Sequence, residues 1–549
     1  MKSVDRRTFV GGLVAASLTS LGSRVSLAQQ PAVLGTTAQI PTLTIPATVS
    51  TFASSGYKTA TDGGAATWVR ASGTYDGRTM VKDVQGNRWL IGNPRIKPEM
   101  FGAQADGVTD STSGIQFALF TGKPVDLAAG TYILSSALLL DLRATPGGVP
   151  VELAGAGMGV TKIIQTSFQG GFGFLGSTAA GTPFYIHDFS IGRTNQAAFT
   201  GTTGPHTVVL EYGNNMLVSN VEEFGSLGMG ILLVGCGKYE IAGCYVHDHK
   251  SGAVHLSGTD GIHVDTSVGP GLVHNNTVQN VGDDAISHGS YVGTITAGQN
   301  GVQVYANKVT NLAGSIKVFG NAANIVIHDN QVANSTAAGI SLWDDQNIGL
   351  SWSIQNIQII NNTITSCGGT GASGGISLLQ NTGTGTQAFI NILIATNSIA
   401  NCVYGVSIFS AVPTKVSQQI TIQGNQISGS QKQGLYITSV TSVTIDSNVI
   451  TNSGADGIRF NSTYTGAFAL TNNKFQGFCT AGVAGSYGGM LIYTNTGNTF
   501  TVTGNTCADT PGRNPEYWGI AAQNLSKSAL AAANAVDPAT TKGVSANLA

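Results

Sequence analysis

Short apolar segments alternate with polar turns along most of the chain, and from about residue 210 this alternation becomes a repeat. Each unit reads Asn-x-Val/Ile, a few polar residues, then Gly and a short apolar strand. β-Branched residues interrupted by Gly favour strands over paired helices. The Val or Ile recurs every 23 to 35 residues, which predicts one solenoid coil per unit; these anchors are Val278, Val309, Val332, Ile364, Ile399, Ile427 and Ile450.

An Asn stands two residues before every anchor. Asn tolerates left-handed backbone, and copies stacked about 4.8 Å apart can hydrogen-bond with one another. We therefore expect an asparagine ladder at one turn of a parallel β-helix, formed by Asn276, Asn307, Asn330, Asn362, Asn397, Asn425 and Asn448 and continued by Asn473, which stands before Phe475. Cys367 and Cys402, each three residues past its anchor, should stack on consecutive coils, either as a disulfide or as a pair of buried thiols.

The pattern divides the chain into regions. Residues 29–95 are rich in Thr, Ser and Gly and predict a small β-rich head, and residues 96–508 carry the solenoid. At its start, Asp110 or Ser111 can cap a helix near 111–120, which would cover the open end of the sheet. Residues 509–549 break the repeat, and their Ala-rich end predicts a C-terminal cap or tail, partly disordered or partly helical.

The first 28 residues predict an export signal. Arg6-Arg7 precede an apolar run that is too short to span a bilayer, and Ser26-Leu27-Ala28 offer a cleavage site. The adjacent arginines followed by Thr-Phe-Val resemble a twin-arginine signal, and an ordinary secretory signal is the alternative. We expect a periplasmic or secreted protein without a membrane span.

Composition narrows the partner classes. Charged residues make up 10% of the chain, against about 25% in an ordinary globular protein, and the net charge is −2. No basic stripe is present, so a nucleic-acid partner is not expected. The six cysteines have no zinc spacing, although Cys236 and Cys244 could pair with each other. The oligomeric state is left open.

Carboxylates are scarce, yet three of them recur about one coil apart. The stretch 259–287 reads TDGIHVDTSVGPGLVHNNTVQNVGDDAIS, in which Asp260 precedes Asp284 by 24 residues. Stacked coils would bring Asp260, Asp283 and Asp284 together, and such crowding should raise one pKa. An inverting glycosidase needs an acid and a base about 6.5–9.5 Å apart, and an offset along the strands could supply that distance. The alternative is turn-forming Asp beside Gly.

Two resemblances bear on this cluster. The stretch FGAQADGVTDSTSGIQFALFTGKPVDLAAGTYIL resembles the opening of the pectate-lyase-like superfamily of right-handed β-helices. That resemblance implies a single-stranded right-handed parallel β-helix. The Thr-Asp-Gly and Gly-Asp-Asp runs further resemble glycoside hydrolase family 28, the polygalacturonases and rhamnogalacturonases. This implies polysaccharide hydrolysis in which Asp284 is the general acid and Asp260 with Asp283 positions the water.

The chain departs from the family 28 pattern beyond these runs. The family's Gly-His-Gly would fall near Gly314-Ser315, and its Arg-x-Lys near Ser341 and Trp343. The missing basic pair puts galacturonide binding in doubt, because those side chains would meet a sugar carboxylate. Lys317 lies one coil early and is a candidate substitute.

Further candidates for substrate contact surround the acids, and each has a structural alternative. Six histidines lie between 247 and 288, which predicts a groove on one outer face. Lys317 could serve as a lyase base or contact an anionic sugar, and Trp343 could stack on a sugar. The predicted substrate-binding residues are His255, His263, Asp265, His288, Lys317 and Trp343.

The sequence thus predicts an exported enzyme that acts on a polysaccharide, most simply a glycosidase. A polysaccharide lyase or an epimerase acting on a uronate is the first alternative, and a non-catalytic glycan-binding or surface solenoid is the second. Hydrolysis requires no cofactor and no metal site is assigned, whereas a lyase of this fold could use Ca²⁺.

Overall fold

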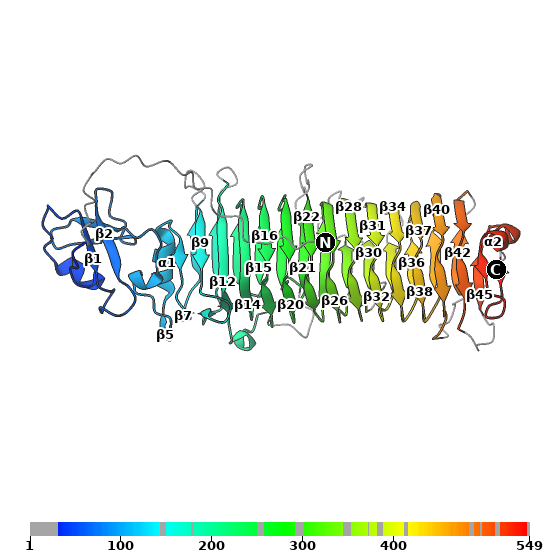
Figure 1. The fold of residues 1–549 in the computed structure, drawn as a ribbon, viewed down its shortest axis with the longest axis horizontal. Helices are drawn as coiled ribbons and strands as arrows, with labels where there is room; N and C mark the ends of the chain where they lie inside the picture. The colour runs from blue at the N-terminus through cyan, green and yellow to red at the C-terminus, as the bar shows by residue number, and fades with distance from the viewer. Residues whose placement is uncertain are drawn as a thin grey trace, which may run out of the picture.

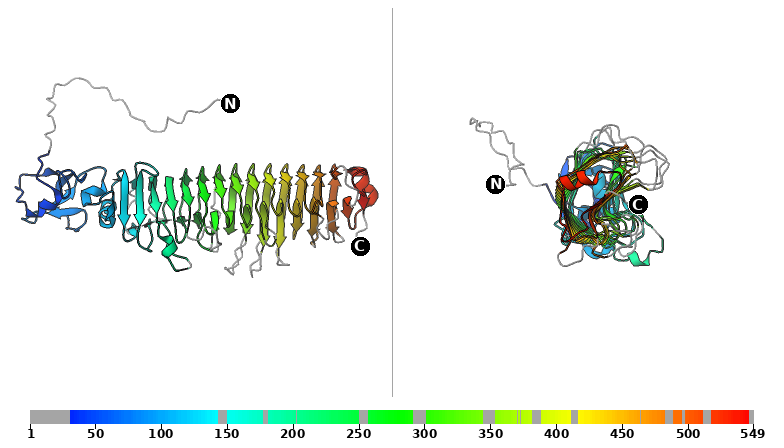
Figure 2. Two further views of the ribbon diagram at one scale, coloured as in Figure 1. Left: turned by 90° about the horizontal axis from the view of Figure 1, so that it is seen from below. Right: turned by 90° about the vertical axis from the view of Figure 1, so that its right-hand side faces the viewer.

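The protein is a long rod with a small domain at its N-terminal end (Figure 1). The computed structural model describes residues 31–545 except 143–149, 177–180, 202, 250–256, 291–300, 344–352, 370, 372, 381–387, 411–415, 463, 482–487, 495–496 and 511–516. Viewed along the rod, the coils superpose on one another (Figure 2). The fold is the predicted right-handed parallel β-helix.

Two long parallel sheets run along the rod in the described part of the chain. The 15-stranded sheet, which carries the predicted site, consists of β8 Leu138–Asp141, β11 Phe172–Leu175, β13 Val208–Glu211, β15 Ile231–Val234, β18 Ile262–Asp265, β21 Asp284–Ser290, β24 Gly314–Gly320, β27 Ile340–Trp343, β30 Ile376–Gln380, β33 Val406–Ser410, β36 Leu435–Thr438, β39 Ile458–Ser462, β42 Gly488–Thr494, β45 Trp518–Ala522 and β47 Val544–Ser545.

The other sheet has 28 strands and bends in each coil between a longer and a shorter strand. The short strands are β17 Tyr245–His247, β20 Thr277–Gln279, β23 Lys308–Thr310, β26 Gln331–Ala333, β29 Thr363–Thr365, β32 Ser398–Ala400, β35 Gln426–Ser428, β38 Val449–Thr451, β41 Lys474–Gln476, β44 Thr506–Ala508 and β46 Ala535–Val536. The remaining strands are β5 Asp106–Asp110, β6 Val125–Asp126, β7 Gly130–Leu134, β9 Val151–Ala154, β10 Thr161–Gln165, β12 Phe184–Gly192, β14 Met216–Phe224, β16 Tyr239–Ala242, β19 Gly271–His274, β22 Val302–Tyr305, β25 Ala322–His328, β28 Ser353–Ile360, β31 Ala388–Ala395, β34 Gln418–Gln423, β37 Ser442–Asp446, β40 Ala467–Thr471 and β43 Thr499–Thr503.

The predicted anchors form one continuous apolar column inside the coils. Each anchor pairs in register with the next, as Val278 does with Val309 and Ile364 with Ile399. All seven are at most 2% exposed. Burying a side chain of this size contributes about 1.5–3 kcal/mol, so the repeated apolar position holds each coil on its neighbours.

The predicted asparagine ladder is confirmed. Nδ2 of Asn362 donates to Oδ1 of Asn397 at 3.0 Å, and Nδ2 of Asn397 donates to Oδ1 of Asn425 at 3.0 Å. Each side chain also donates to a backbone carbonyl, as Asn397 does to Ile359 at 2.8 Å. The ladder extends beyond the prediction, through Asn505 to Asn534.

Both ends of the solenoid are covered. The helix expected near 111–120 is α1, Thr112–Phe120, with Ser111 as its N-cap residue, and it buries Ile115, Ala118 and Leu119. Ahead of it, the head contains the antiparallel sheet β1 Thr51–Ser54, β2 Ala66–Ala71, β4 Arg88–Ile91 and β3 Met80–Lys82, and the 3-10 helices η1 Thr37–Thr42 and η2 Pro98–Phe101. A third 3-10 helix, η3 Gln196–Ala198, lies in the solenoid.

The C-terminal region differs from the boundary expected at residue 508. The strands β45, β46 and β47 extend both long sheets by a further coil, so the solenoid continues past that point. The Ala-rich segment forms the helix α2, Lys527–Ala533, which begins at the N-cap Ser526 and covers this end of the rod (Figure 1).

The cysteines considered for pairing are buried thiols. Cys236 and Cys244 lie in the core as thiols, so the disulfide considered between them does not form. Cys367 and Cys402 stack on consecutive coils as predicted, with the Cys367 backbone N–H 3.4 Å from the Cys402 Sγ.

Replacing Asn397 with Ala should destabilise the solenoid. The change removes the side-chain acceptor of the Asn362 backbone N–H, one of the acceptors of the Asn362 side-chain amide, and the side-chain donor to the Ile359 carbonyl. Buried unsatisfied groups cost about 1–3 kcal/mol each, so we expect the free energy of unfolding in urea to fall by about 2–4 kcal/mol. The exposed neighbour Ser398→Ala should change it by less than about 0.5 kcal/mol. Equal effects of the two substitutions would contradict the role of the ladder.

Candidate functional site

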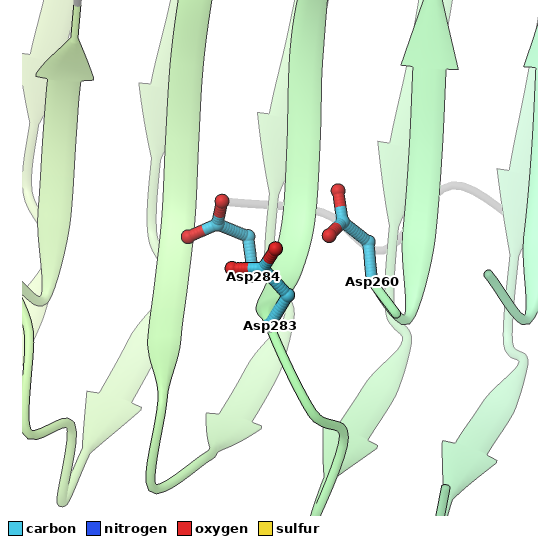
Figure 3. A group of neighbouring side chains, drawn as sticks. All are labelled: Asp260, Asp283 and Asp284. Atoms are coloured by element: carbon cyan, nitrogen blue, oxygen red, sulfur yellow. The ribbon is translucent and has the colours of Figure 1, made fainter. Parts of the chain in front are cut away.

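The three predicted carboxylates meet where two adjacent strands of the 15-stranded sheet, β18 and β21, begin (Figure 3). Asp260 lies two residues before β18, Asp284 begins β21, and Asp283 directly precedes it. The register pairs Ile262 with Ile286, so Asp260 lies level with Asp284 on the next coil. One oxygen of each carboxyl lies within 4.8 Å of the others. The expected convergence is confirmed, and the cluster is tighter than the separation of about 6.5–9.5 Å anticipated for an inverting pair.

A glycine after Asp260 allows this close approach. Its backbone N–H donates to the Asp284 carbonyl at 3.0 Å. A Cβ on Gly261 would lie 2.6 Å from the Ala285 carbonyl oxygen and 2.6 Å from a Val278 methyl group. Only glycine fits there without moving a coil, which explains the Asp-Gly pair at this turn.

The surroundings of Asp260 favour its ionised form. Its Oδ2 accepts from His263 Nδ1 at 2.6 Å and from the Ser287 hydroxyl, and all three side chains are almost fully buried. Burial alone would raise the pKa of Asp260, but the His263 hydrogen bond and charge, followed by the Ser287 hydrogen bond, hold it below its ordinary value. Asp260 is therefore a carboxylate at neutral pH.

Asp283 has the opposite electrostatics. Burial, followed by repulsion from Asp284 and Asp260, raises the pKa of Asp283 to about 8, against a smaller opposing effect of Lys317. Its Oδ2 accepts from the Gly258 backbone N–H at 2.9 Å. The crowding thus raises one pKa as predicted, and the group affected is Asp283. A protonated and an ionised carboxyl at neutral pH lie side by side, which is what acid–base catalysis needs.

Lys317 extends from the next coil, on β24. Its Nζ lies 3.1 Å from Asp284 Oδ2, so the two side chains form an ion pair. The same Nζ lies 5.2 Å from the centre of the Trp343 ring on β27, in a cation–π arrangement. Lys317 and Trp343 therefore belong to the same outer face as the acids, as expected.

The remaining predicted residues divide into three cases. His263 lies at the centre of the cluster, and its ring stacks on Phe319 at 5.1 Å between centroids. Asp265 also faces outward on β18 and accepts from the Thr266 hydroxyl at 2.7 Å. His255 lies outside the described residues.

The prediction that His288 contacts substrate is wrong. Its side chain points into the solenoid, where it is 1% exposed, hydrogen-bonds with the Tyr239 hydroxyl and stacks on the Tyr239 ring. Burial lowers its pKa to about 3, with a further contribution from the charge of His263. His288 is one residue past Ser287, and because side chains alternate along a strand, that single step turns it inward.

Ser287 and Phe319 were missed as site residues. Ser287 pairs in register with His263, which stands 24 residues earlier, the same spacing that links Asp260 to Asp284. Applying that spacing to His263 would have found the serine. A second omission is the buried hydrogen-bonded pair behind the site, in which His249 Nε2 lies 2.7 Å from Glu223 Oε2 and His249 Nδ1 lies 3.2 Å from the Thr259 carbonyl oxygen.

The carboxylate cluster partly suits a divalent cation. Its three oxygens are hard donors that could all reach one Ca²⁺ at about 2.3–2.6 Å, although Ca²⁺ takes 6–8 ligands. Lys317 already places a positive charge against Asp284. The three carboxylates could therefore bind a metal ion, but the Lys317 ammonium already provides a positive charge next to them. No helix among the described residues is long and apolar enough to cross a membrane.

The chain belongs to the right-handed β-helix family. The model of the right-handed beta helix region matches residues 194–364 and 410–537, together more than half of the chain. No curated protein matches the sequence. The specific likeness to glycoside hydrolase family 28 stays a prediction.

Several solved structures are similar. The catalytic unit of a thermostable GH87 α-1,3-glucanase from Streptomyces thermodiastaticus has 16% identity and a TM-score of 0.50, over 76% of this chain and 72% of that one. The A-module of a mannuronan C-5 epimerase from Azotobacter vinelandii has 17% identity and a TM-score of 0.46, over 76% and 100%. A surface adhesin of Streptococcus pneumoniae has 13% identity and a TM-score of 0.43, over 67% and 92%. At these identities the likeness shows the fold alone.

Asp283→Asn should stabilise the protein above neutral pH. The folded pKa of Asp283, about 8, lies above its ordinary value, so its contribution to stability is complete below about pH 4 and is lost as the pH rises through about 8. The amide cannot ionise and avoids this loss. At about 1.4 kcal/mol per pKa unit, reduced for partial solvation, we expect a gain of about 2–4 kcal/mol at pH 9 and almost none at pH 4.

Urea unfolding of the variant and wild type at both pH values measures this gain. Asp446→Asn is a control of opposite sign, because the Thr471 hydrogen bond lowers the pKa of Asp446. Its contribution is present above its ordinary pKa, so the control should lose stability at neutral pH. An Asp283→Asn variant that gains nothing at pH 9 would show that Asp283 ionises normally.

Proposed function

We propose that the protein is a glycoside hydrolase that cleaves a polysaccharide bound on the outer face of the solenoid over β18, β21 and β24. The observation that carries this proposal is the opposed ionisation of two adjacent carboxyls, with the pKa of Asp283 raised to about 8 and that of Asp260 lowered. Proteins of the same fold include an α-1,3-glucanase, which is consistent with the proposal.

The roles follow from these protonation states. Asp283 donates its proton to the glycosidic oxygen as the bond breaks, and Asp260 accepts a proton from the attacking water. The carboxyl oxygens lie within 4.8 Å of one another, closer than the usual separation of about 6.5–9.5 Å in inverting enzymes, so this assignment requires the water to approach Asp260 from the side away from Asp283. The role of general acid therefore passes from Asp284, as first expected, to Asp283.

The surrounding side chains tune the two carboxyls. His263 and Ser287 keep Asp260 ionised and oriented through their hydrogen bonds. Asp284 raises the pKa of Asp283 by its charge, and Lys317 limits that rise while holding Asp284 in place. Trp343, next to Lys317, offers an aromatic face on which a sugar ring can stack.

Eliminative cleavage of a uronate, or its epimerisation, is the second candidate. The observation that favours it is the carboxylate cluster, which could hold Ca²⁺ against a sugar carboxylate while Lys317 removes the C5 proton. Cytoplasmic action is not expected under either candidate, since we propose export through the N-terminal signal. A non-catalytic glycan-binding solenoid would bind without cleavage.

The products distinguish these candidates. The signal-free protein is incubated with a panel of neutral and acidic polysaccharides, with and without EDTA. Hydrolysis should release reducing ends without ultraviolet absorbance, and EDTA should leave the rate unchanged. An unsaturated product absorbing in the ultraviolet, removed by EDTA and restored by Ca²⁺, would replace the hydrolase with a lyase. Binding without any cleavage would favour the non-catalytic solenoid.

The pH dependence of kcat/KM should report the two carboxyls. Activity should fall as the pH rises through about 8, where Asp283 loses its proton, and also in strong acid, where Asp260 gains one. Asp284→Asn should move the alkaline limb to lower pH, and Lys317→Met should move it to higher pH, because the two charges act on Asp283 in opposite directions. Asp283→Asn should reduce kcat at least about 100-fold.

Variants that shift the alkaline limb in the same direction, or an Asp283→Asn variant with wild-type kcat, would remove Asp283 from the mechanism. Asp446→Asn serves as the control in this assay. It removes a carboxylate from the other sheet and should leave the pH profile unchanged.

A further inference from the structure

The turn that presents Asp260 occurs a second time on the same sheet. Residues 258–264 read GTDGIHV, and residues 454–460 read GADGIRF. Both segments lead into strands of the 15-stranded sheet, β18 and β39, which stand seven coils apart, or about 34 Å at the usual spacing. The first Gly, the Asp, the second Gly and the Ile are shared, and in each copy a basic side chain follows the Asp by three residues.

The two copies also share their geometry. Asp456 Oδ2 accepts from Arg459 Nε at 2.8 Å, as Asp260 accepts from His263. The N–H of Gly457 donates to the carbonyl of the next coil at 3.2 Å, as the N–H of Gly261 does at 3.0 Å. The side chain of Asp456 is fully buried. The second turn therefore repeats the scaffold of the first.

The second copy differs from the first at the position level with its Asp on the next coil. Where Asp284 stands opposite Asp260, Gly488 stands opposite Asp456 and donates its N–H to Asp456 Oδ1 at 3.0 Å. Asp456 therefore accepts from Arg459 and from the Gly488 backbone N–H, and the residue level with it on the next coil is a glycine. The repeated turn presents a guanidinium, 23% exposed, in place of a carboxylate cluster.

Tyrosine and lysine side chains occupy the two coils that precede Arg459. Arg459 pairs in register with Tyr436 on β36, whose ring stacks on that of Tyr404 at 5.4 Å. The exposed Lys432 places its Nζ 3.4 Å from the Tyr404 hydroxyl and 5.2 Å from the centre of the ring. With one carboxylate against two cations, this cluster of Tyr404, Lys432, Tyr436, Asp456 and Arg459 has a formal charge of +1.

Cations are rare on this sheet. Lys317 and Arg459 are the only Lys or Arg in its described strands, and both occupy the same row of outward-facing positions. Ser377 and Ser407, which lie between them in that row, are fully buried. The exposed surface is therefore interrupted between Lys317 and Arg459, and the two cations belong to separate surface regions. Arg459 donates to Asp456 Oδ2 through both Nε and Nη2, and its guanidinium, 23% exposed, belongs to the side-chain type whose planar geometry best matches a carboxylate.

We propose that the cluster at Arg459 is a second saccharide-binding site, which does not cleave and which recognises the carboxylate of an acidic sugar. The guanidinium and the Lys432 ammonium would contact the carboxylate, and the two tyrosine hydroxyls would contact the sugar hydroxyls. The proposal rests on the proposed function only in taking a polysaccharide as the ligand. It implies that the polymer bound by this protein carries uronate units.

Calorimetric titration of the full, signal-free chain tests the site. The Asp283→Asn variant serves as the parent so that no ligand is cleaved. The probes are hexamers of galacturonate and of mannuronate, each compared with its methyl ester, which keeps the chain but lacks the charge. At least one acid should bind about tenfold or more tightly than its ester, with an affinity that falls as salt is added.

Three further variants locate that binding. Lys432→Met should weaken it about tenfold, and Arg459→Lys should weaken it less, because it keeps the charge against Asp456 but loses the fork. Lys474→Met removes an exposed lysine from β41 on the other sheet and should change nothing. Arg459→Lys also guards against misfolding, since Asp456 keeps a cationic partner.

The inference is overturned if neither acid binds more tightly than its ester, or if Lys432→Met and Arg459→Lys both bind like the parent. If binding of the uronate hexamer is lost in Lys317→Met but kept in Lys432→Met and Arg459→Lys, the hexamer binds at the carboxylate cluster and not at Arg459. Cleavage is measured separately on the active protein. A protein that cleaves no polysaccharide could therefore still bind the uronate hexamer at Arg459, and a protein that does not bind the hexamer there could still cleave a polysaccharide.

Discussion

Every feature of this protein depends on the in-register stacking of parallel coils. Because each coil places its backbone hydrogen bonds and its side chains directly over those of the last, residues about two dozen positions apart become neighbours. The apolar column from Val278 to Ile450 and the asparagine ladder beside it both hold that register. A slip of one residue would turn the anchors outward and separate Asp260 from Asp284.

Stacking also explains how a chain with so few charges obtains a site with strongly unequal carboxyls. Three acids from two coils are forced together at the partly buried start of β18 and β21, where one of them can no longer ionise readily. The neighbours decide which one. His263 and Ser287 hydrogen-bond with Asp260, Lys317 forms an ion pair with Asp284, and Asp283 accepts from the Gly258 backbone N–H. The asymmetry arises because burial and repulsion from the other two acids raise the pKa of Asp283, whereas the hydrogen bonds and charge of its neighbours lower that of Asp260.

The same short turn occurs at two positions along the solenoid. The Asp-Gly-Ile turn places a buried carboxylate and a following basic group on the outer face wherever it occurs, because the glycine admits the next coil and the isoleucine fills the core. What the turn can do depends on the coil that follows it. Acids follow Asp260, whereas a glycine follows Asp456, and the two sites differ in charge for that reason.

The sequence by itself determined the fold, the ladder, the N-terminal cap and the meeting of the three acids, because all of these follow from a period that can be read along the chain. It did not determine the continuation past residue 508, where the coil is closed by α2 and short strands that lack the repeat. Nor did it decide the inward direction of His288 or the protonation of Asp283. These depend on side-chain alternation counted from an exact strand position and on the burial and charges of neighbours from other coils, which only the tertiary structure brings together.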